Sequence, residues 1–331
     1  MIMKIQIKNL RKSALLFAAC TLSIIITLLP GCQSKIPSDS SGLVSSSVSG
    51  TVSNSGSSVT PKDGKFTFVT SFYPIYISVI NITQGIDNVE VFNMTTAQTG
   101  CLHDYQLKPQ DLKTLEQADA FVINGAGMES FMDDVIKQQP GLSVIDASKG
   151  IELLKDQFGE SNPHVWVSIT NNMTQVRNIA DALALIDPKN AISYKKNSSL
   201  YLSKLNTLRS KADQELTTLK TRDIITFHEA FPYFAKEFNL NILAVIEREP
   251  NTPPTAKDLE AIIKTIKDSA TKALFAEPQY SSKAAQTIAD STGATVYTLD
   301  PIVTGEANSS AINNYITTME KNIATLKEAL G

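Results

Sequence analysis

The feature that most constrains the fold is a repeated alternation of short β-rich runs with helical patterns, interrupted once by a long helical segment. Four runs rich in β-branched and aromatic residues lie on each side of that segment. They cover residues 66–71, 89–93, 120–124 and 143–146 in the first half, and 223–227, 241–245, 272–275 and 295–299 in the second. Strands that alternate with helices form parallel sheets that the helices cover. The sequence therefore predicts an α/β fold with two (β/α)4-like lobes.

The segment between the halves predicts one long helix over residues 188–220. Asp187 followed by Pro188 is typical of a helix start. Apolar residues then recur at steps of three or four, with no internal Pro or Gly. The stripe, which has one polar member, comprises Ala191, Tyr194, Ser198, Tyr201, Leu205, Leu208, Ala212, Leu216 and Leu219. Such a helix is about 50 Å long at 1.5 Å per residue, so we expect a rigid connector between the lobes. A helical hairpin packed on one lobe is the alternative.

The N-terminal segment has the order of an export signal. Four basic residues precede an apolar stretch over residues 14–29, and Gly31-Cys32 follows. The stretch is shorter than the ~20 residues that cross a bilayer as a helix. The small residues that end in Gly31-Cys32 resemble the bacterial lipobox. That resemblance implies that Cys32 is acylated, becomes the N-terminus and anchors the protein to the outer face of the cell membrane.

Composition sets the remaining boundaries. Residues 1–31 are the expected signal peptide, and residues 32–64, rich in Ser, Gly, Val and Thr without an apolar period, predict a flexible tether. We expect the first lobe over residues 65–186, the linking helix over 187–221 and the second lobe over 222–331. The chain has 331 residues, of which 42% are hydrophobic. That is enough for two lobes, each with its own core.

Charge and cysteine content exclude several classes of protein. The formal net charge of -3 gives no broad basic surface for nucleic acid. Two of the three cysteines lie in or directly after the apolar N-terminal stretch, so no disulfide framework is expected. A small cationic or neutral ligand fits this composition better than a nucleic acid does.

The chain has only three histidines, and each lies beside other polar residues. They are His103 in Leu-His-Asp-Tyr, His164 in Asn-Pro-His-Val-Trp and His228 in Phe-His-Glu. They are too far apart in sequence for a local zinc-finger spacing, so the fold must assemble any shared site.

Two polar residues directly follow predicted strands of the second lobe. His228 follows Phe227 at the end of one strand, and Asp300 follows Leu299 at the end of another. Open α/β sheets bind ligands at the carboxyl ends of their strands. If the lobes face each other, three imidazoles and one carboxylate make a four-coordinate site at their interface, suited to a borderline-soft divalent ion.

Over roughly residues 66–330 the chain resembles the metal-binding solute-binding lipoproteins of zinc and manganese ABC importers. The motifs that carry the resemblance occur in the family's order, with the long helix between the second and third histidine. They are Ser71-Phe72-Tyr73-Pro74, His103-Asp104-Tyr105, Asn162-Pro163-His164-Val165-Trp166, Phe227-His228-Glu229-Ala230-Phe231 and Thr298-Leu299-Asp300-Pro301. The resemblance implies two α/β lobes joined by a rigid helix, with a metal ion at their interface.

The resemblance also implies the ligands and the partners. The family's ligands fall on His103, His164 and His228, and its fourth, an aspartate or water, falls on Asp300. Manganese members usually have glutamate where this chain has His228, so we expect zinc as the transported ion; a manganese or iron ligand is the alternative. The implied partners are an ABC importer permease and its ATPase. We expect a monomer that contacts the membrane only through its N-terminal lipid.

Two further side chains compete for a place in the site. Glu277 follows a predicted strand, and we interpret it as an orienting or structural carboxylate rather than a ligand. Cys101 lies two residues before His103, and a thiolate is an excellent zinc ligand. Residues i and i+2 of an extended segment share a face, so geometry does not exclude Cys101. Its role stays open.

Two other classes of function share some of these sequence features. A hydrolytic zinc enzyme is the first, but a second histidine four residues after His228 would be needed for the metalloprotease motif, and Pro232 stands there. No Gly-x-Ser-x-Gly motif for a serine nucleophile occurs either. A surface adhesin presented on the Ser-rich tether is the second. The sequence favours a binding protein over an enzyme.

Overall fold

The computed structural model describes residues 64–102, 105–155, 159–246, 254–269, 271–279 and 281–331. The predicted signal peptide, the predicted lipidation site Cys32 and the predicted tether up to residue 63 lie outside the described residues. His103 lies outside them too. Within the described ranges, no helix has both the length and the apolar character that crossing a membrane requires.

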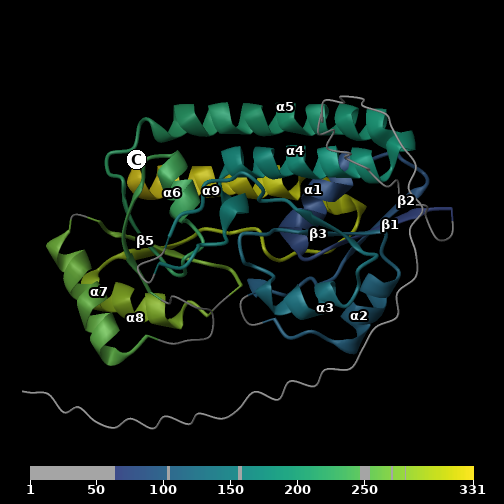
Figure 1. Ribbon diagram of the computed structural model, residues 1–331. Coiled ribbons are helices and arrows are strands. Elements are labelled where there is room, and N and C mark those ends of the chain that lie inside the picture. The colour runs from purple at the N-terminus through teal and green to yellow at the C-terminus, as the bar shows by residue number, and fades with distance from the viewer. Residues whose placement is uncertain (1–63, 103–104, 156–158, 247–253, 270, 280) are drawn as a thin grey trace, which may run out of the picture. The chain divides into compact units, whose positions relative to one another are not determined.

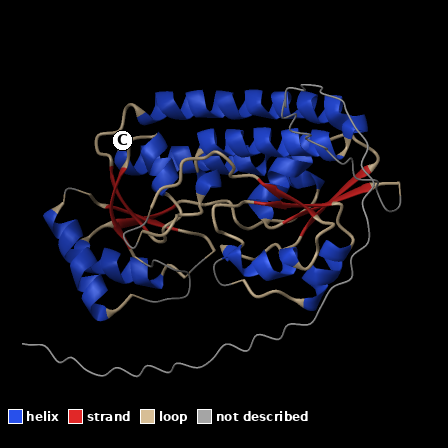
Figure 2. Ribbon diagram, in the orientation of Figure 1, coloured by secondary structure: helices blue, strands red, loops and turns tan. Residues whose placement is uncertain are grey.

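The first lobe is built on a parallel sheet of four strands in the order β2-β1-β3-β4 (Figures 1 and 2). The strands are β1 (Phe66–Thr70), β2 (Val89–Asn93), β3 (Ala120–Ile123) and β4 (Ser143–Asp146). The helices are α1 (Tyr73–Thr83), α2 (Pro109–Glu116), α3 (Asp133–Lys137) and α4 (Ile169–Ile186). All four predicted strands are present in the predicted parallel arrangement.

The two faces of this sheet pack against different helices, as the alternation of side chains requires. Phe66 and Phe68 of β1 face the main core, which includes residues of α1 and α4. Val69 of β1 and Phe121 of β3 face a smaller cluster with Leu115 of α2. Figure 1 shows α2 and α3 on the face opposite to α1 and α4. The sheet is therefore covered on both faces.

The second lobe repeats this arrangement with a parallel sheet in the order β6-β5-β7-β8. The strands are β5 (Asp223–Thr226), β6 (Asn241–Val245), β7 (Ala273–Ala276) and β8 (Thr295–Thr298). The helices are α6 (Pro232–Glu237), α7 (Ala256–Asp268), α8 (Lys283–Thr292) and α9 (Asn314–Leu330). Ile262 and Ile266 of α7 and Ile288 of α8 pack on one face of this sheet. The predicted strands of this half are confirmed, each to within one residue.

The connector is a single long helix, but it is shorter than predicted. A 3-10 turn over Pro188–Asn190 precedes α5 (Ala191–Leu216), whereas the sequence predicted a helix up to residue 220. After Leu216 the hydroxyl groups of Thr217 and Thr218 donate to the backbone carbonyls of Gln214 and Glu215. Seven members of the predicted apolar stripe are buried: Tyr194, Ser198, Tyr201, Leu205, Leu208, Ala212 and Leu216.

The sequence predicted two lobes, each with its own core. That prediction was wrong, because part of the core is shared between the lobes. The main cluster of buried side chains includes Phe68 of the first sheet, Leu205 of α5 and Phe275 of the second sheet. The smaller clusters lie only on the outer faces of the two sheets. Figure 1 shows α5 running above α4, α1 and α9. One shared apolar layer therefore joins both sheets to the connecting helix.

Candidate metal site

His228 lies at the carboxyl end of the second sheet, where the sequence predicted it. It follows Phe227 after β5, and its side chain is 1% exposed. Strands β5 and β7 pair in parallel, with Thr226 opposite Phe275, so the residues that follow both strands are neighbours. Glu277 follows β7, and its Oε1 lies 3.3 Å from Nδ1 of His228.

Glu277 places a carboxylate on the Nδ1 side of the His228 ring. Burial raises the pKa of Glu277, and the proximity of His228 opposes that shift. A carboxylate beside Nδ1 favours a proton on that nitrogen, which directs the lone pair of Nε2 to the opposite side of the ring. This contact suits the orienting role predicted for Glu277, because ligating histidines are commonly held in this way.

His164 comes from the loop between β4 and α4 of the first lobe and is likewise 1% exposed. Asn162 holds it from two sides: Oδ1 accepts hydrogen bonds from the backbone N–H of His164 at 3.0 Å and from its Nδ1 at 3.0 Å. The amide Nδ2 of Asn162 donates to the carbonyl of Glu229 at 2.9 Å, which fixes the amide orientation. Nδ1 of His164 is therefore the protonated nitrogen, and Nε2 is the acceptor.

The two imidazoles meet at the boundary between the lobes. Their ring centroids lie 4.8 Å apart with the planes at 81°. Sγ of Cys101, which follows β2 and is 8% exposed, lies 3.2 Å from Nε2 of His164. One potential ligand atom from each of Cys101, His164 and His228 lies within 4.8 Å of the other two. The fold therefore assembles a buried group of potential metal ligands from both lobes.

Asp300 does not belong to this group of three. It follows β8, as predicted, and is half-buried. Its Oδ1 accepts hydrogen bonds from Nε2 of Gln279 and from the backbone N–H of Ile302, both at 2.8 Å. Its role as the fourth ligand stays a prediction. The role of His103 as a ligand also stays a prediction, because that residue lies outside the described part of the chain.

The sequence analysis predicted no role for Asn162, although the residue begins the motif Asn162-Pro163-His164-Val165-Trp166. Its position two residues before His164 is the signal, because Asn side chains often bond the backbone two residues further on. The bond to Nδ1 depends on the ring rotamer, which sequence spacing does not specify.

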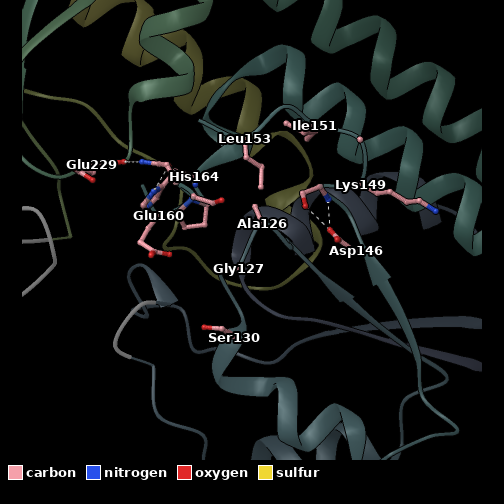
Figure 3. A pocket seen from close by; sticks show the side chains of 15 residues that line it. Ala126, Gly127, Ser130, Asp146, Lys149, Ile151, Leu153, Glu160, His164 and Glu229 are labelled. Atoms are coloured by element: carbon pink, nitrogen blue, oxygen red, sulfur yellow. Dashed lines mark hydrogen bonds between the residues drawn. The ribbon is translucent and has the colours of Figure 1, made fainter. Parts of the chain in front are cut away.

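A cavity of about 790 Å³ adjoins the group and has His164 and Glu229 in its lining. Figure 3 shows His164 and Glu160 at one end of it and Asp146 and Lys149 at the other. Its lining has three carboxylates, from Asp146, Glu160 and Glu229, and one ammonium group, from Lys149. This balance favours a cation in the approach to His164.

Comparison with known proteins identifies the family. The family described as "Zinc-uptake complex component A periplasmic", ZnuA, matches residues 68–329. The chain belongs to the ZnuA family. Its two parallel four-stranded lobes agree with this assignment.

Two zinc proteins are similar to the chain over most of its length. The zinc-binding protein AdcA of Streptococcus pyogenes serotype M1 is 31% identical over 293 residues, which cover 80% of this chain and 56% of AdcA. The high-affinity zinc uptake system protein ZnuA of Bacillus subtilis (strain 168) is 29% identical over 296 residues, 84% of this chain and 92% of that protein. The chain thus spans little more than half the length of the AdcA relative.

Three solved structures have the same ZnuA-type fold. A crystal structure of ZnuA gives a TM-score of 0.72 at 29% identity, covering 81% of this chain and 100% of that one. FpvC of Pseudomonas aeruginosa in complex with Mn2+ gives 0.71 at 29%, covering 80% and 98%. A mutant of the laminin-binding adhesin Lmb from Streptococcus agalactiae gives 0.72 at 28%, covering 80% and 100%.

Proposed function

We propose that this protein captures one zinc ion outside the cytoplasm and delivers it to an ABC importer composed of a permease and an ATPase. The observation that carries the proposal is the pair of buried imidazoles, His164 and His228, that meet from opposite lobes. Nδ1 of His164 has an oxygen acceptor in Asn162, and a carboxylate oxygen of Glu277 lies 3.3 Å from Nδ1 of His228, an arrangement that leaves Nε2 of each ring for a metal ion. The names of the relatives, zinc-binding protein AdcA and zinc uptake protein ZnuA, support zinc as the ligand.

The proposed ligands are the three histidines, His103, His164 and His228, with Asp300 or water as the fourth. Imidazole nitrogen suits zinc, whereas manganese prefers six oxygen-rich ligands. The similarity to the Mn2+ complex of FpvC means that the fold alone does not select the metal. We propose that the ligand atoms select the metal, and the potential ligand atoms among the described residues are nitrogen and sulfur. Manganese or iron is the alternative ligand.

We further propose a binding protein that acts as a monomer and not as an enzyme. Pro232 begins α6 four residues after His228, where a metalloprotease helix would supply its second histidine. Adhesion is the second candidate function, favoured by the similarity to Lmb. Saturable binding to a host matrix protein that persists in His164→Ala and His228→Ala variants would support adhesion in place of transport.

The test of zinc capture is elemental analysis of the full-length chain, followed by competitive titration with zinc and manganese. We expect one zinc per chain and a strong loss of affinity in His164→Ala and His228→Ala. Lys149→Ala is the matched control, because Lys149 lies in the cavity lining but offers no donor to the group. Zinc affinity that survives the loss of both histidines would refute the proposed site.

Membrane attachment through Cys32 is a separate proposal that depends on the sequence alone. The basic segment, the apolar stretch and Gly31-Cys32 support it. Replacing Cys32 with Ala should move the protein from the membrane fraction to the soluble fraction. Detergent-dependent membrane association of that variant would contradict the assignment.

A further inference from the structure

Cys101 occupies a position that the proposed zinc site does not yet use. It lies between β2 and α2, in the first lobe, and its side chain is almost fully buried. Its Sγ is 3.2 Å from Nε2 of His164, the nitrogen on the side of the ring opposite to Asn162. A thiol at this position therefore lies on the metal-binding side of the imidazole.

The tautomer of His164 gives this contact its direction. Because Nδ1 donates its proton to Asn162, Nε2 carries the lone pair, and the thiol S–H is the donor between them. The same lone pair is the one that would bind a metal ion. A bound ion would therefore replace the thiol proton as the group between Sγ and Nε2.

We propose that Cys101 is a ligand of the captured metal ion and that its thiolate, rather than the carboxylate of Asp300, binds the ion beside His164 and His228. This inference rests on the proposed function and deepens it. On binding, the S–H bond breaks, a sulfur–metal bond forms and the proton passes to solvent, with no change of oxidation state. Zinc binds deprotonated thiols in this way.

The distances among the three described donors agree with a single ion shared by all three. With Zn–S near 2.3 Å and Zn–N near 2.0–2.1 Å, tetrahedral ligand atoms lie roughly 3.4–3.6 Å apart. One donor atom from each of Cys101, His164 and His228 already lies within 4.8 Å of the others, so a contraction of about 1 Å completes the arrangement. Asp300 lies outside that group, and its Oδ1 already accepts two hydrogen bonds.

A thiolate changes what the site selects. Sulfur is a soft ligand that favours zinc and disfavours manganese, which prefers hard oxygen. A carboxylate in the same position would be more tolerant of manganese. Cys101 thus binds the ion and also determines the preference of the site for zinc over manganese.

The experiment uses the full-length chain with Cys20→Ser and Cys32→Ser, so that Cys101 is the only thiol among the three cysteines. Cobalt(II) is added as a spectroscopic substitute for zinc, and near-ultraviolet sulfur-to-cobalt charge transfer is measured. We expect the absorption in this chain and in Asp300→Asn, its loss in Cys101→Ser, and its loss when zinc displaces cobalt. Zinc affinity should fall at least tenfold in Cys101→Ser, with little change for manganese.

Stoichiometric cobalt without charge-transfer absorption, or zinc affinity unchanged in Cys101→Ser, would overturn the role of Cys101 and leave zinc capture intact. Absence of bound cobalt and zinc in every variant would instead refute the proposed function. If Cys101→Ser does not fold, X-ray absorption of the zinc-loaded parent chain decides whether sulfur binds the zinc ion. One sulfur at about 2.3 Å from zinc supports the proposal, and a shell of only nitrogen and oxygen overturns it.

Discussion

The indole Nε1–H of Trp166 donates a 2.7 Å hydrogen bond to the backbone carbonyl of Pro301. Trp166 lies two residues after His164, and Pro301 directly follows Asp300, so this bond joins the two segments from opposite lobes beside the site. The ring is fully buried and packs in a T-shaped arrangement against Phe72, with the ring centroids 4.9 Å apart. The lobes are therefore held together by a specific polar contact as well as by the shared core.

Replacing Trp166 with Phe should lower the free energy of unfolding by about 1–3 kcal/mol. The reason is that the carbonyl of Pro301 would stay buried without its donor. Chemical denaturation of the metal-free protein measures the effect. Phe72→Leu is the control, because it reduces packing on the indole and leaves the hydrogen bond in place. Equal stability of Trp166→Phe and the parent protein would show that the bond contributes nothing.

Zinc binding should produce only small shifts of the lobes. Helix α5 has no internal Gly or Pro, and one apolar layer continues from it into both sheets. A wide hinge opening would break that layer, whereas loop movements near the site would not. Small-angle scattering should give the same radius of gyration, within error, with and without zinc. A large compaction on zinc addition would contradict this expectation.

Replacing Asn162 with Ala should weaken zinc binding by roughly 10–100-fold, since residues that orient metal-binding histidines have effects of this size. The change removes the acceptor at Nδ1 of His164 and frees the ring to adopt the other tautomer. Isothermal or competitive zinc titration measures it. Asn81→Ala is the matched control: Asn81 is also buried and also donates to a carbonyl of the C-terminal half, that of Ile312, but contacts no histidine. An equal loss in both variants would indicate general destabilisation.

Replacing His228 with Glu should shift selectivity toward manganese, because it exchanges an imidazole for a hard oxygen donor. Zinc affinity should fall, and manganese affinity should rise relative to the parent. In the parent, zinc binding should weaken as the pH falls, since protons and zinc compete for the same imidazole nitrogens. Paired titrations with both metals check these points. A parent protein that binds manganese as tightly as zinc would mean that the donor set is wrong.

Glu129 should make the protein less stable as the pH rises. Burial raises its pKa from 4.5 to about 7, although its carboxylate accepts hydrogen bonds from the backbone N–H groups of Asn124 and Gly125. The folded protein holds this proton to a higher pH than the unfolded chain does. The free energy of unfolding therefore falls between about pH 4.5 and 7, by on the order of 2–3 kcal/mol from this group.

Denaturation of Glu129→Gln across that pH range tests this effect, because the variant lacks the titrating group. Its stability should depend less on pH than that of the parent. Glu328→Gln, which changes an exposed carboxylate, should follow the parent. Identical pH dependence in the parent and in Glu129→Gln would show that Glu129 does not titrate in this window.

The strand pattern was predictable because each strand is a short run of β-rich residues bounded by breaks in the pattern. Val89–Asn93, Ser143–Asp146 and Asn241–Val245 have the predicted bounds, and the other strands differ by a residue at their ends. The end of α5 was placed at residue 220 and lies at Leu216, because the apolar periodicity used to predict it continues through Leu219.

The sequence by itself determined two parallel α/β halves, a long helix between them, and the placement of His228 and Asp300 just after strands. These properties follow from local patterns and from the rule that parallel strands end at one edge of a sheet. Only the tertiary structure decided which donors meet. Cys101 and His164 are far apart in the chain, yet Sγ and Nε2 lie 3.2 Å apart, whereas Asp300 lies outside the group. Contacts of that kind depend on how two lobes pack and on side-chain rotamers, which neither periodicity nor spacing in one sequence specifies.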